Sequence, residues 1–155
     1  MKIYIAGGLF NEAEVAQRKL EGQLLREAFG DKIDIFNPIE QPFNEDKQSL
    51  PTPSDIFWGD TKAVEDCDIV LADVTNDDPG VMAELGIAFA RDKHIIAINS
   101  DIRLKSASAY EVPSYSMNHY VLGLIETSGV LVFSFEEAIE EIKRELEKRV
   151  DWYST

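Results

Sequence analysis

The 155-residue chain is predicted to be a single α/β domain, residues 1–155, in which a parallel sheet lies between two layers of helices. Two observations predict this class. Short apolar runs alternate with helical segments along the whole chain, a pattern typical of parallel strands joined by crossover helices. The run Ile69-Val-Leu-Ala72 is continuously apolar, as expected for a central strand that is buried on both faces.

Five strands and five helices are predicted in alternation. The strands are expected at residues 2–6, 33–36, 68–74, 94–98 and 129–133. This number favours the flavodoxin-like strand order 2-1-3-4-5, in a three-layer sandwich, over a six-stranded Rossmann order.

Local signals mark the helices. The first is expected over residues 11–29, with Asn11 as N-cap and Gly30 as the C-terminal stop. Helices follow at about residues 54–65, with Ser54 or Asp55 near the cap, and after Asp78, which precedes Pro79. Two more are expected around residues 114–126 and from the cap Ser134 to residue 149, whereas the proline-containing segment 37–55 is predicted to be irregular.

The composition excludes several classes of function. The net charge is -14 and the pI is about 4.4, with no basic stripe for a nucleic acid and a charge that acidic membrane surfaces repel. The single cysteine, Cys67, rules out an intrachain disulfide and is interpreted as a small, partly buried residue. No signal peptide or membrane-spanning run is visible, so a cytoplasmic location is the default expectation.

Glu84 is the most informative residue. It is the only charged residue between Pro79 and Ala90, where the predicted helix is apolar all the way round. Such a helix is normally buried, and a carboxylate there must be paired, protonated or reactive. We therefore expect Glu84 to be sequestered and to take part in chemistry.

In this class of fold, ligands bind beyond the carboxyl ends of the strands. The candidate residues expected there are Gly7, Gly8, Phe10, Asn37, Glu40, Gln41, Asp73, Asp77, Asp78, Asp101 and Arg103. Gly7-Gly8 lacks the spaced third glycine of a dinucleotide site and is interpreted as a tight turn or as a place where a ligand approaches the backbone. No P-loop is present, no cofactor is expected, and His94 and His119 are not clustered with carboxylates, so no metal site is expected.

A buried Glu84 near one or more aspartates predicts a carboxylate group of the kind that retaining glycosyl transfer uses. That reaction needs a carboxylate nucleophile about 5 Å from an acid that protonates the leaving group. Burial raises the pKa of one carboxyl group while polar neighbours keep that of another low.

The chain resembles the nucleoside 2-deoxyribosyltransferase family over nearly its whole length. The resemblance is carried by Asp60, by Asp66-Cys-Asp-Ile-Val-Leu-Ala-Asp73, by Asp77-Asp-Pro-Gly80 and by Ala83-Glu-Leu-Gly-Ile-Ala88. The opening Ile3-Tyr-Ile-Ala-Gly-Gly8 and the later Ser116-Met-Asn-His-Tyr-Val-Leu-Gly-Leu124 also fit the family.

The resemblance implies a two-step displacement in which Glu84 attacks C1′ of a 2′-deoxynucleoside and a second base or water then attacks the ester. Tyr4 would hydrogen-bond Glu84 and orient it, and either Asp60 or Asp78 would carry the proton of the leaving base. Gly7, Gly8, Phe10, Gln41, Asp77, Gly80 and Asn118 are the expected substrate-binding residues.

The same resemblance implies a homo-oligomer, a dimer or hexamer, in which Asn118 completes the site of a neighbouring subunit. The expected partners are a small 2′-deoxynucleoside and a free base, with neither nucleic acid nor membrane. Two alternatives stay open: an N-glycosidase acting on deoxynucleosides or their 5′-monophosphates, and a non-catalytic nucleotide-sensing module. The role of Asp101 and Arg103 is left open, and the absence of Ser or Thr in Gly7-Gly-Leu-Phe10 favours free nucleosides.

Overall fold

The structure is a computed structural model that describes residues 1–42, 50–102 and 117–152. The described part contains a five-stranded, all-parallel sheet in the order β2-β1-β3-β4-β5, as predicted. The strands are β1 (Lys2–Ala6), β2 (Asp34–Phe36), β3 (Ile69–Asp73), β4 (His94–Ile98) and β5 (Gly129–Val132). No helix in these segments is long and apolar enough to cross a membrane.

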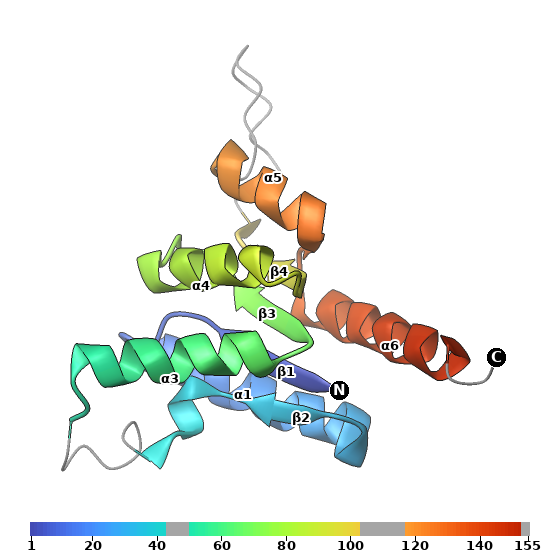
Figure 1. The fold of residues 1–155 in the computed structure, drawn as a ribbon, viewed down its shortest axis with the longest axis horizontal. Coiled ribbons are helices and arrows are strands. Elements are labelled where there is room, and N and C mark those ends of the chain that lie inside the picture. The colour runs from blue at the N-terminus through green and yellow to red at the C-terminus, as the bar shows by residue number, and fades with distance from the viewer. Residues whose placement is uncertain (43–49, 103–116, 153–155) are drawn as a thin grey trace.

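Five α-helices flank this sheet in the described residues (Figure 1). They are α1 (Glu12–Phe29), α3 (Pro53–Asp66), α4 (Pro79–Ala90), α5 (His119–Ser128) and α6 (Phe135–Trp152). The short 3-10 turns η1 (Gly30–Lys32) and η2 (Pro38–Glu40) precede and follow β2, and η2 lies within the segment that was expected to be irregular.

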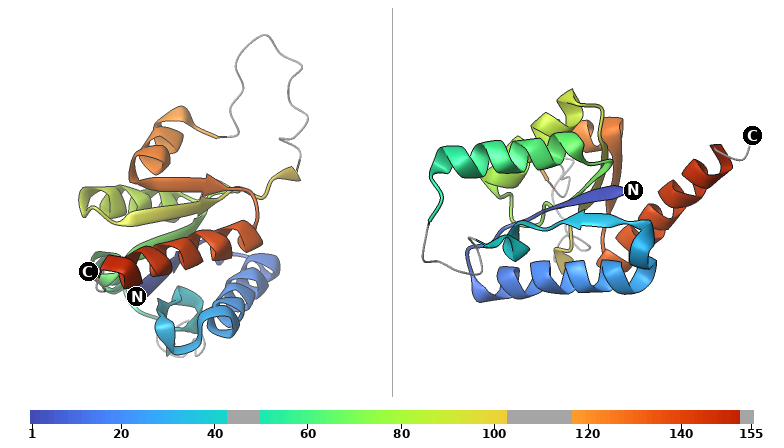
Figure 2. Two further views of the ribbon diagram at one scale, coloured as in Figure 1. Left: turned by 90° about the vertical axis from the view of Figure 1, so that its right-hand side faces the viewer. Right: turned by 60° about the horizontal axis from the view of Figure 1, so that its bottom comes forward.

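The side-chain alternation of the strands builds two cores. Tyr4, Ala6, Val70 and their neighbours pack against α3, α4 and α5, whereas Ile3, Ile5, Leu71 and theirs pack against α1 and α6. Figure 2 shows α1 and α3 on opposite sides of the sheet. Because both faces of the central strands are covered, their apolar runs are continuous, as in other buried parallel sheets.

The caps locate the helix starts. Asn11 accepts a hydrogen bond from Glu14 N, and Asp78 accepts one from Val81 N, as predicted for N-cap residues. The start of α3 was placed slightly too late, because Thr52 is the N-cap and forms a capping box with Asp55. Helix α5 begins at His119 because the Asn118 side chain accepts from Tyr120 N and Val121 N; residues 114–116 of the predicted helix lie outside the described residues.

Helix α4 is not buried on all sides, and this expectation was wrong. Val81, Leu85 and Ala88 are buried against the sheet side, but Ala83, Gly86 and Phe89 are exposed, with 48% of Phe89 accessible. In a three-layer domain an outer helix can bury only one face against its own chain. The outward apolar face of α4 therefore lies open in a single subunit.

Candidate active site

The strand residue Tyr4 and the helix residue Glu84 meet beside the sheet. Tyr4 is fully buried, and its hydroxyl group donates a 2.7 Å hydrogen bond to Glu84 Oε1, the contact that the family resemblance implies. The Tyr4 ring stacks on Phe36 of β2, with ring centroids 5.5 Å apart and planes 11° from parallel. The hydrogen bond thus fixes Glu84 Oε1, and the stack on Phe36 holds the Tyr4 ring in place.

Burial dominates the electrostatics of this pair. The pKa of Glu84 is raised to about 7, mainly by burial; the Tyr4 hydrogen bond lowers it, and the negative charges of Asp60 and Asp78 add to the rise. The pKa of Tyr4 is raised far above its usual range, first by burial and then by the Glu84 charge. Tyr4 therefore keeps its proton at neutral pH and acts as a donor, and Glu84 changes its charge near neutrality.

Asp60 of α3 is the second carboxyl group of the site. Burial raises its pKa to about 6, and its charge acts on both Tyr4 and Glu84. In the described residues no hydrogen bond satisfies its carboxylate, whereas Oδ1 of Asp78 accepts the Val81 N–H as the cap of α4. Three elements, β1, α3 and α4, thus bring Tyr4, Asp60 and Glu84 into one electrostatic group.

The first loop contains Gly7, Gly8 and Phe10. The space that a Cβ atom would need at Gly7 is filled by the Arg18 guanidinium, only 1.6 Å away, and at Gly8 by the Glu14 carboxylate, 2.9 Å away. Neither glycine has a positive φ angle, so close approach of side chains explains them better than turn geometry. Phe10 is 86% exposed, and its N–H donates to Glu14 Oε2.

The turn before α4 contains the other predicted residues of this edge. Asp77 has a left-handed backbone, with φ of 51°, which leads the chain into the Asp78 cap. Gly80 is exposed in the first turn of α4, and a Cβ atom there would lie 3.0 Å from Asp78 Oδ1. The Gly80 backbone therefore lies close to the Asp78 carboxylate.

The remaining predicted residues are not brought to Glu84 by any described contact. Gln41 donates a long hydrogen bond of 3.4 Å to Asn37 O, and Glu40 is held by Arg26 in a two-pronged ion pair. Asn118 is exposed and caps α5. Asp101 N donates to Asn99 Oδ1 next to β4, and Arg103 lies outside the described residues.

Sequence reasoning missed two features of this edge. One is the Phe36 ring that supports Tyr4. The other is Arg18, which is only 2% exposed and contacts Glu21 and Asp73. The signal for Arg18 was its helical spacing, because it shares the buried face of α1 with Gly22, Leu25 and Phe29.

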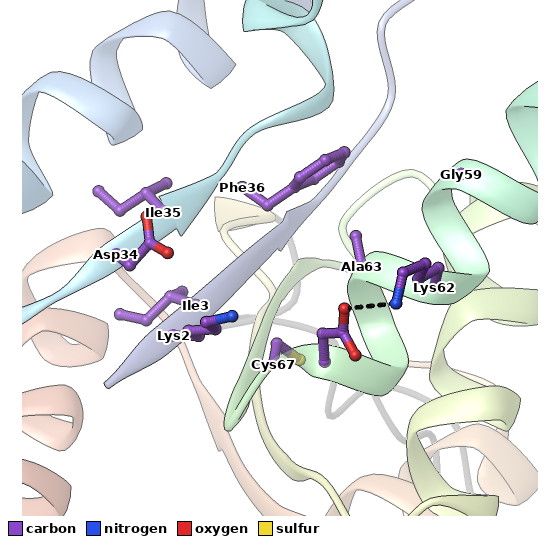
Figure 3. A pocket seen from close by; sticks show the side chains of 10 residues that line it. Lys2, Ile3, Asp34, Ile35, Phe36, Gly59, Lys62, Ala63 and Cys67 are labelled. Atoms are coloured by element: carbon purple, nitrogen blue, oxygen red, sulfur yellow. Dashed lines mark hydrogen bonds and ion pairs between the residues drawn. The ribbon is translucent and has the colours of Figure 1, made fainter.

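A cavity of about 280 Å³ lies between β2 and α3 and contains none of the predicted site residues (Figure 3). Its walls include Phe36, Ala63 and the buried Cys67, with the Lys62–Asp66 ion pair at its side. The Cys67 thiol donates to Val64 O, and burial raises its pKa to about 11, which suits the structural role predicted for it. Within the described residues, no group of three or more His, Cys, Asp or Glu side chains could hold a metal ion.

The strand order and the helices on both faces of the sheet define a flavodoxin-like α/β domain, in which Tyr4, Asp60 and Glu84 form one group of side chains. Residues 3–141 match the family described as nucleoside 2-deoxyribosyltransferase, and the chain belongs to this family. It is also 31% identical to the uncharacterized protein UU063 of Ureaplasma parvum serovar 3, over 96% of this chain and 98% of that protein.

Solved structures share the fold. A conserved protein from Enterococcus faecalis V583 is 29% identical, with a TM-score of 0.81 over 94% of this chain and 98% of that one. The 2-desoxiribosyltransferase from Leishmania mexicana has 19% identity and a TM-score of 0.66, covering 94% and 97%. The CMP N-glycosidase BcmB from Clostridium botulinum has 16% identity and a TM-score of 0.59, covering 94% and 99%.

Proposed function

We propose that this protein transfers 2-deoxyribose between nucleobases by a retaining double displacement through Glu84. The observation that carries the proposal is the 2.7 Å hydrogen bond from the buried Tyr4 hydroxyl to Glu84 Oε1. A structural carboxylate in this position would be expected to have a cationic partner, yet Glu84 contacts a neutral donor and lies near two further acids. Membership of the family supports a nucleoside as the substrate.

The chemistry follows from the free oxygen of Glu84. With Oε1 held by Tyr4, Oε2 attacks C1′ of the deoxynucleoside, the C1′–N bond breaks, and its electron pair leaves with the base. A proton from an acid neutralises the departing base nitrogen. A second base then attacks C1′ of the ester, releases the Glu84 carboxylate and returns its own N–H proton to the acid.

Asp60 is the better candidate for this acid. Its pKa, about 6, leaves a far larger protonated fraction near neutral pH than an ordinary aspartate has, and no described hydrogen bond occupies its oxygens. Asp78 uses Oδ1 to cap α4. In this proposal Asp78 keeps the helix start in place and contributes negative charge beside the sugar.

Incubation with a deoxynucleoside and a second free base tests the proposed function. Formation of the new deoxynucleoside supports transfer. Release of free deoxyribose without exchange would instead indicate an N-glycosidase, in which water takes the place of the acceptor base. Ligand binding without any turnover would indicate a sensing module and would contradict the proposal.

Tyr4→Phe is expected to lower kcat by between about 10- and 100-fold, the scale of one hydrogen bond to a charged group. Because that hydrogen bond lowers the Glu84 pKa, its loss is expected to move the acidic limb of the rate profile to higher pH. The ring stack on Phe36 can persist, so the fold should be retained. A kcat/KM profile against pH measures both effects, with Phe36→Leu as the control that keeps the hydroxyl group.

An oligomer with shared sites belongs to the same proposal. The outward face of α4 and the neighbouring helix α3 expose Phe89, Ile56, Phe57 and Trp58, which is a large apolar area for a monomer. Light scattering should show an assembly that Phe89→Asp weakens and Leu20→Asp, on the opposite face, leaves intact. If Asn118 serves a neighbouring subunit, mixed Glu84→Gln and Asn118→Ala subunits should recover activity that neither variant has alone.

A further inference from the structure

Arg18 forms a buried charge cluster at the carboxyl edge of the sheet, on the side of α1. Its Nη2 atom donates to Glu21 Oε1 and to Asp73 Oδ2, both at 2.8 Å, and only 2% of the residue is exposed. Tyr4 and Glu84 lie on the other face of the sheet, in the core formed with α3 and α4. The Arg18 cluster is therefore not part of the Tyr4–Asp60–Glu84 group, although it lies at the carboxyl edge of the same sheet.

Three strand ends contact Arg18. The guanidinium occupies the space beside Gly7 that a Cβ atom would fill, so it packs directly on the chain that leaves β1. Asp73 ends β3, and the Arg18 carbonyl oxygen accepts a hydrogen bond from Asn37 Nδ2 at the end of β2. Burying a guanidinium is unfavourable unless it is paired, which makes this arrangement a costly one for purely local stability.

The Asp73 carboxylate extends the connection toward α4. Its Oδ2 binds Arg18, and its Oδ1 accepts the Thr75 N–H at 3.0 Å. The Thr75 hydroxyl group in turn accepts the Ser100 N–H at 3.1 Å. The same turn continues through Asp77 to the cap Asp78, which begins the helix of Glu84.

We propose that Arg18 is a positioning residue that holds the loop after β1 and the turn after β3 in one fixed relation, and thereby fixes the deoxynucleoside above Glu84. The inference rests on the proposed function, because these two segments contain the expected substrate-binding residues. It assigns Arg18 no contact with the reacting atoms. Loss of the Arg18 contacts should weaken binding of the substrate and of the transition state equally. KM should therefore rise, and kcat should stay unchanged.

Asp73→Asn and Glu21→Gln form a matched pair for the test. Each substitution replaces one of the two carboxylates that accept a hydrogen bond from Arg18 Nη2 with a neutral amide. Asparagine at position 73 has one acceptor oxygen for two donors, Thr75 N and Arg18 Nη2, which the carboxylate serves with separate oxygens. Glutamine at position 21 keeps the one oxygen that accepts from both Arg18 and Gln17.

Asp73→Asn is expected to raise KM for the deoxynucleoside about tenfold with kcat within about twofold of wild type, and Glu21→Gln to change neither by more than about twofold. Arg18→Lys keeps the charge without the forked donor, and should also raise KM. Arg144→Met, which removes an exposed ion pair on α6, controls for loss of an arginine. Equal effects of Asp73→Asn and Glu21→Gln, or an unchanged KM in folded Asp73→Asn and Arg18→Lys, would overturn the inference.

Amide hydrogen exchange gives a readout that does not need turnover. Asp73→Asn is expected to accelerate exchange in residues 7–10 and 75–78 together, while β4 and α6 keep wild-type protection at equal global stability. If wild type neither transfers nor hydrolyses, the proposed function fails, and this measurement still decides whether Arg18 couples the two segments. Faster exchange throughout the domain would show that the cluster contributes only to global stability, and would contradict the inference.

The Gly7 contact offers an independent check. Gly7→Ala should lower stability because its Cβ atom would collide with the guanidinium. In an Arg18→Ala background that collision is absent, so the same substitution should have a smaller effect. Additive losses in the double variant would mean that Arg18 does not support the first loop.

Discussion

Glu84→Gln is expected to lower kcat for deoxyribosyl transfer by at least about 10³-fold, because an amide cannot form the glycosyl ester. Glutamine keeps the shape of the side chain and can still accept the Tyr4 hydrogen bond. The loss should therefore come from chemistry and not from misfolding. Rapid-quench measurement of a single turnover is the direct assay, since it reports formation of the ester and not product release.

The same variant is expected to be more stable than wild type above neutral pH. Burial raises the folded-state pKa of Glu84 from its usual value of 4.5 to about 7. The protonated form is therefore favoured on folding, so the contribution of Glu84 to stability is fully present below about pH 4.5 and is lost as the pH rises through 7. Glutamine does not titrate. The stability of Glu84→Gln relative to wild type should therefore increase between about pH 4.5 and 7 and then stay constant.

Chemical denaturation at several pH values measures this difference, with Glu27→Gln as the control. Glu27 is exposed on α1, so the same change there should produce no such trend. Glu84→Ala should also abolish turnover and retain the fold. Near-wild-type transfer by either Glu84 variant would exclude the covalent mechanism, and equal stability of Glu84→Gln and wild type at every pH would show that residue 84 is solvated.

The strands and the unusual position of Glu84 were predictable from sequence because each depends on a local signal. Continuous apolar runs identify buried parallel strands, and a lone acid in an apolar helix stands out against its neighbours. The Tyr4 contact was expected only from the family resemblance, and the structure places the even-numbered residues of β1 on the sheet face that packs against α4.

Arg18 and the open face of α4 were harder to predict because their environments are set by tertiary structure. Whether an arginine on an amphipathic helix is buried depends on partners such as Asp73, 55 residues along the chain. The chain itself covers only one side of the apolar helix α4, and an apolar composition does not distinguish a fully buried helix from one with an exposed apolar face. Sequence left the role of acid open between Asp60 and Asp78, because an aspartate that caps a helix can still face a ligand; the structure shows that Oδ1 of Asp78 accepts the Val81 N–H.

Asp60→Asn is expected to lower kcat/KM by about 10²- to 10⁴-fold for a natural deoxynucleoside, the range of general acid catalysis. The loss should shrink for a substrate with an electron-poor base, which departs without a proton. Asp78→Asn is the matched control, because asparagine is an equally good N-cap and the α4 start should survive. A larger, leaving-group-dependent loss in Asp78→Asn than in Asp60→Asn would transfer the role of acid to Asp78.

The pH profile provides the second arm of this prediction. The productive form needs Glu84 ionised and Asp60 protonated, and their pKa values are about 7 and about 6. Because the acid has the lower pKa, this form is a minority at every pH, and kcat/KM of the wild type should peak between pH 6 and 7. Asp60→Asn, assayed with the electron-poor substrate, should lose the alkaline limb. The limb that remains then reports the ionisation of Glu84 alone, and the activity should reach a plateau once Glu84 is ionised.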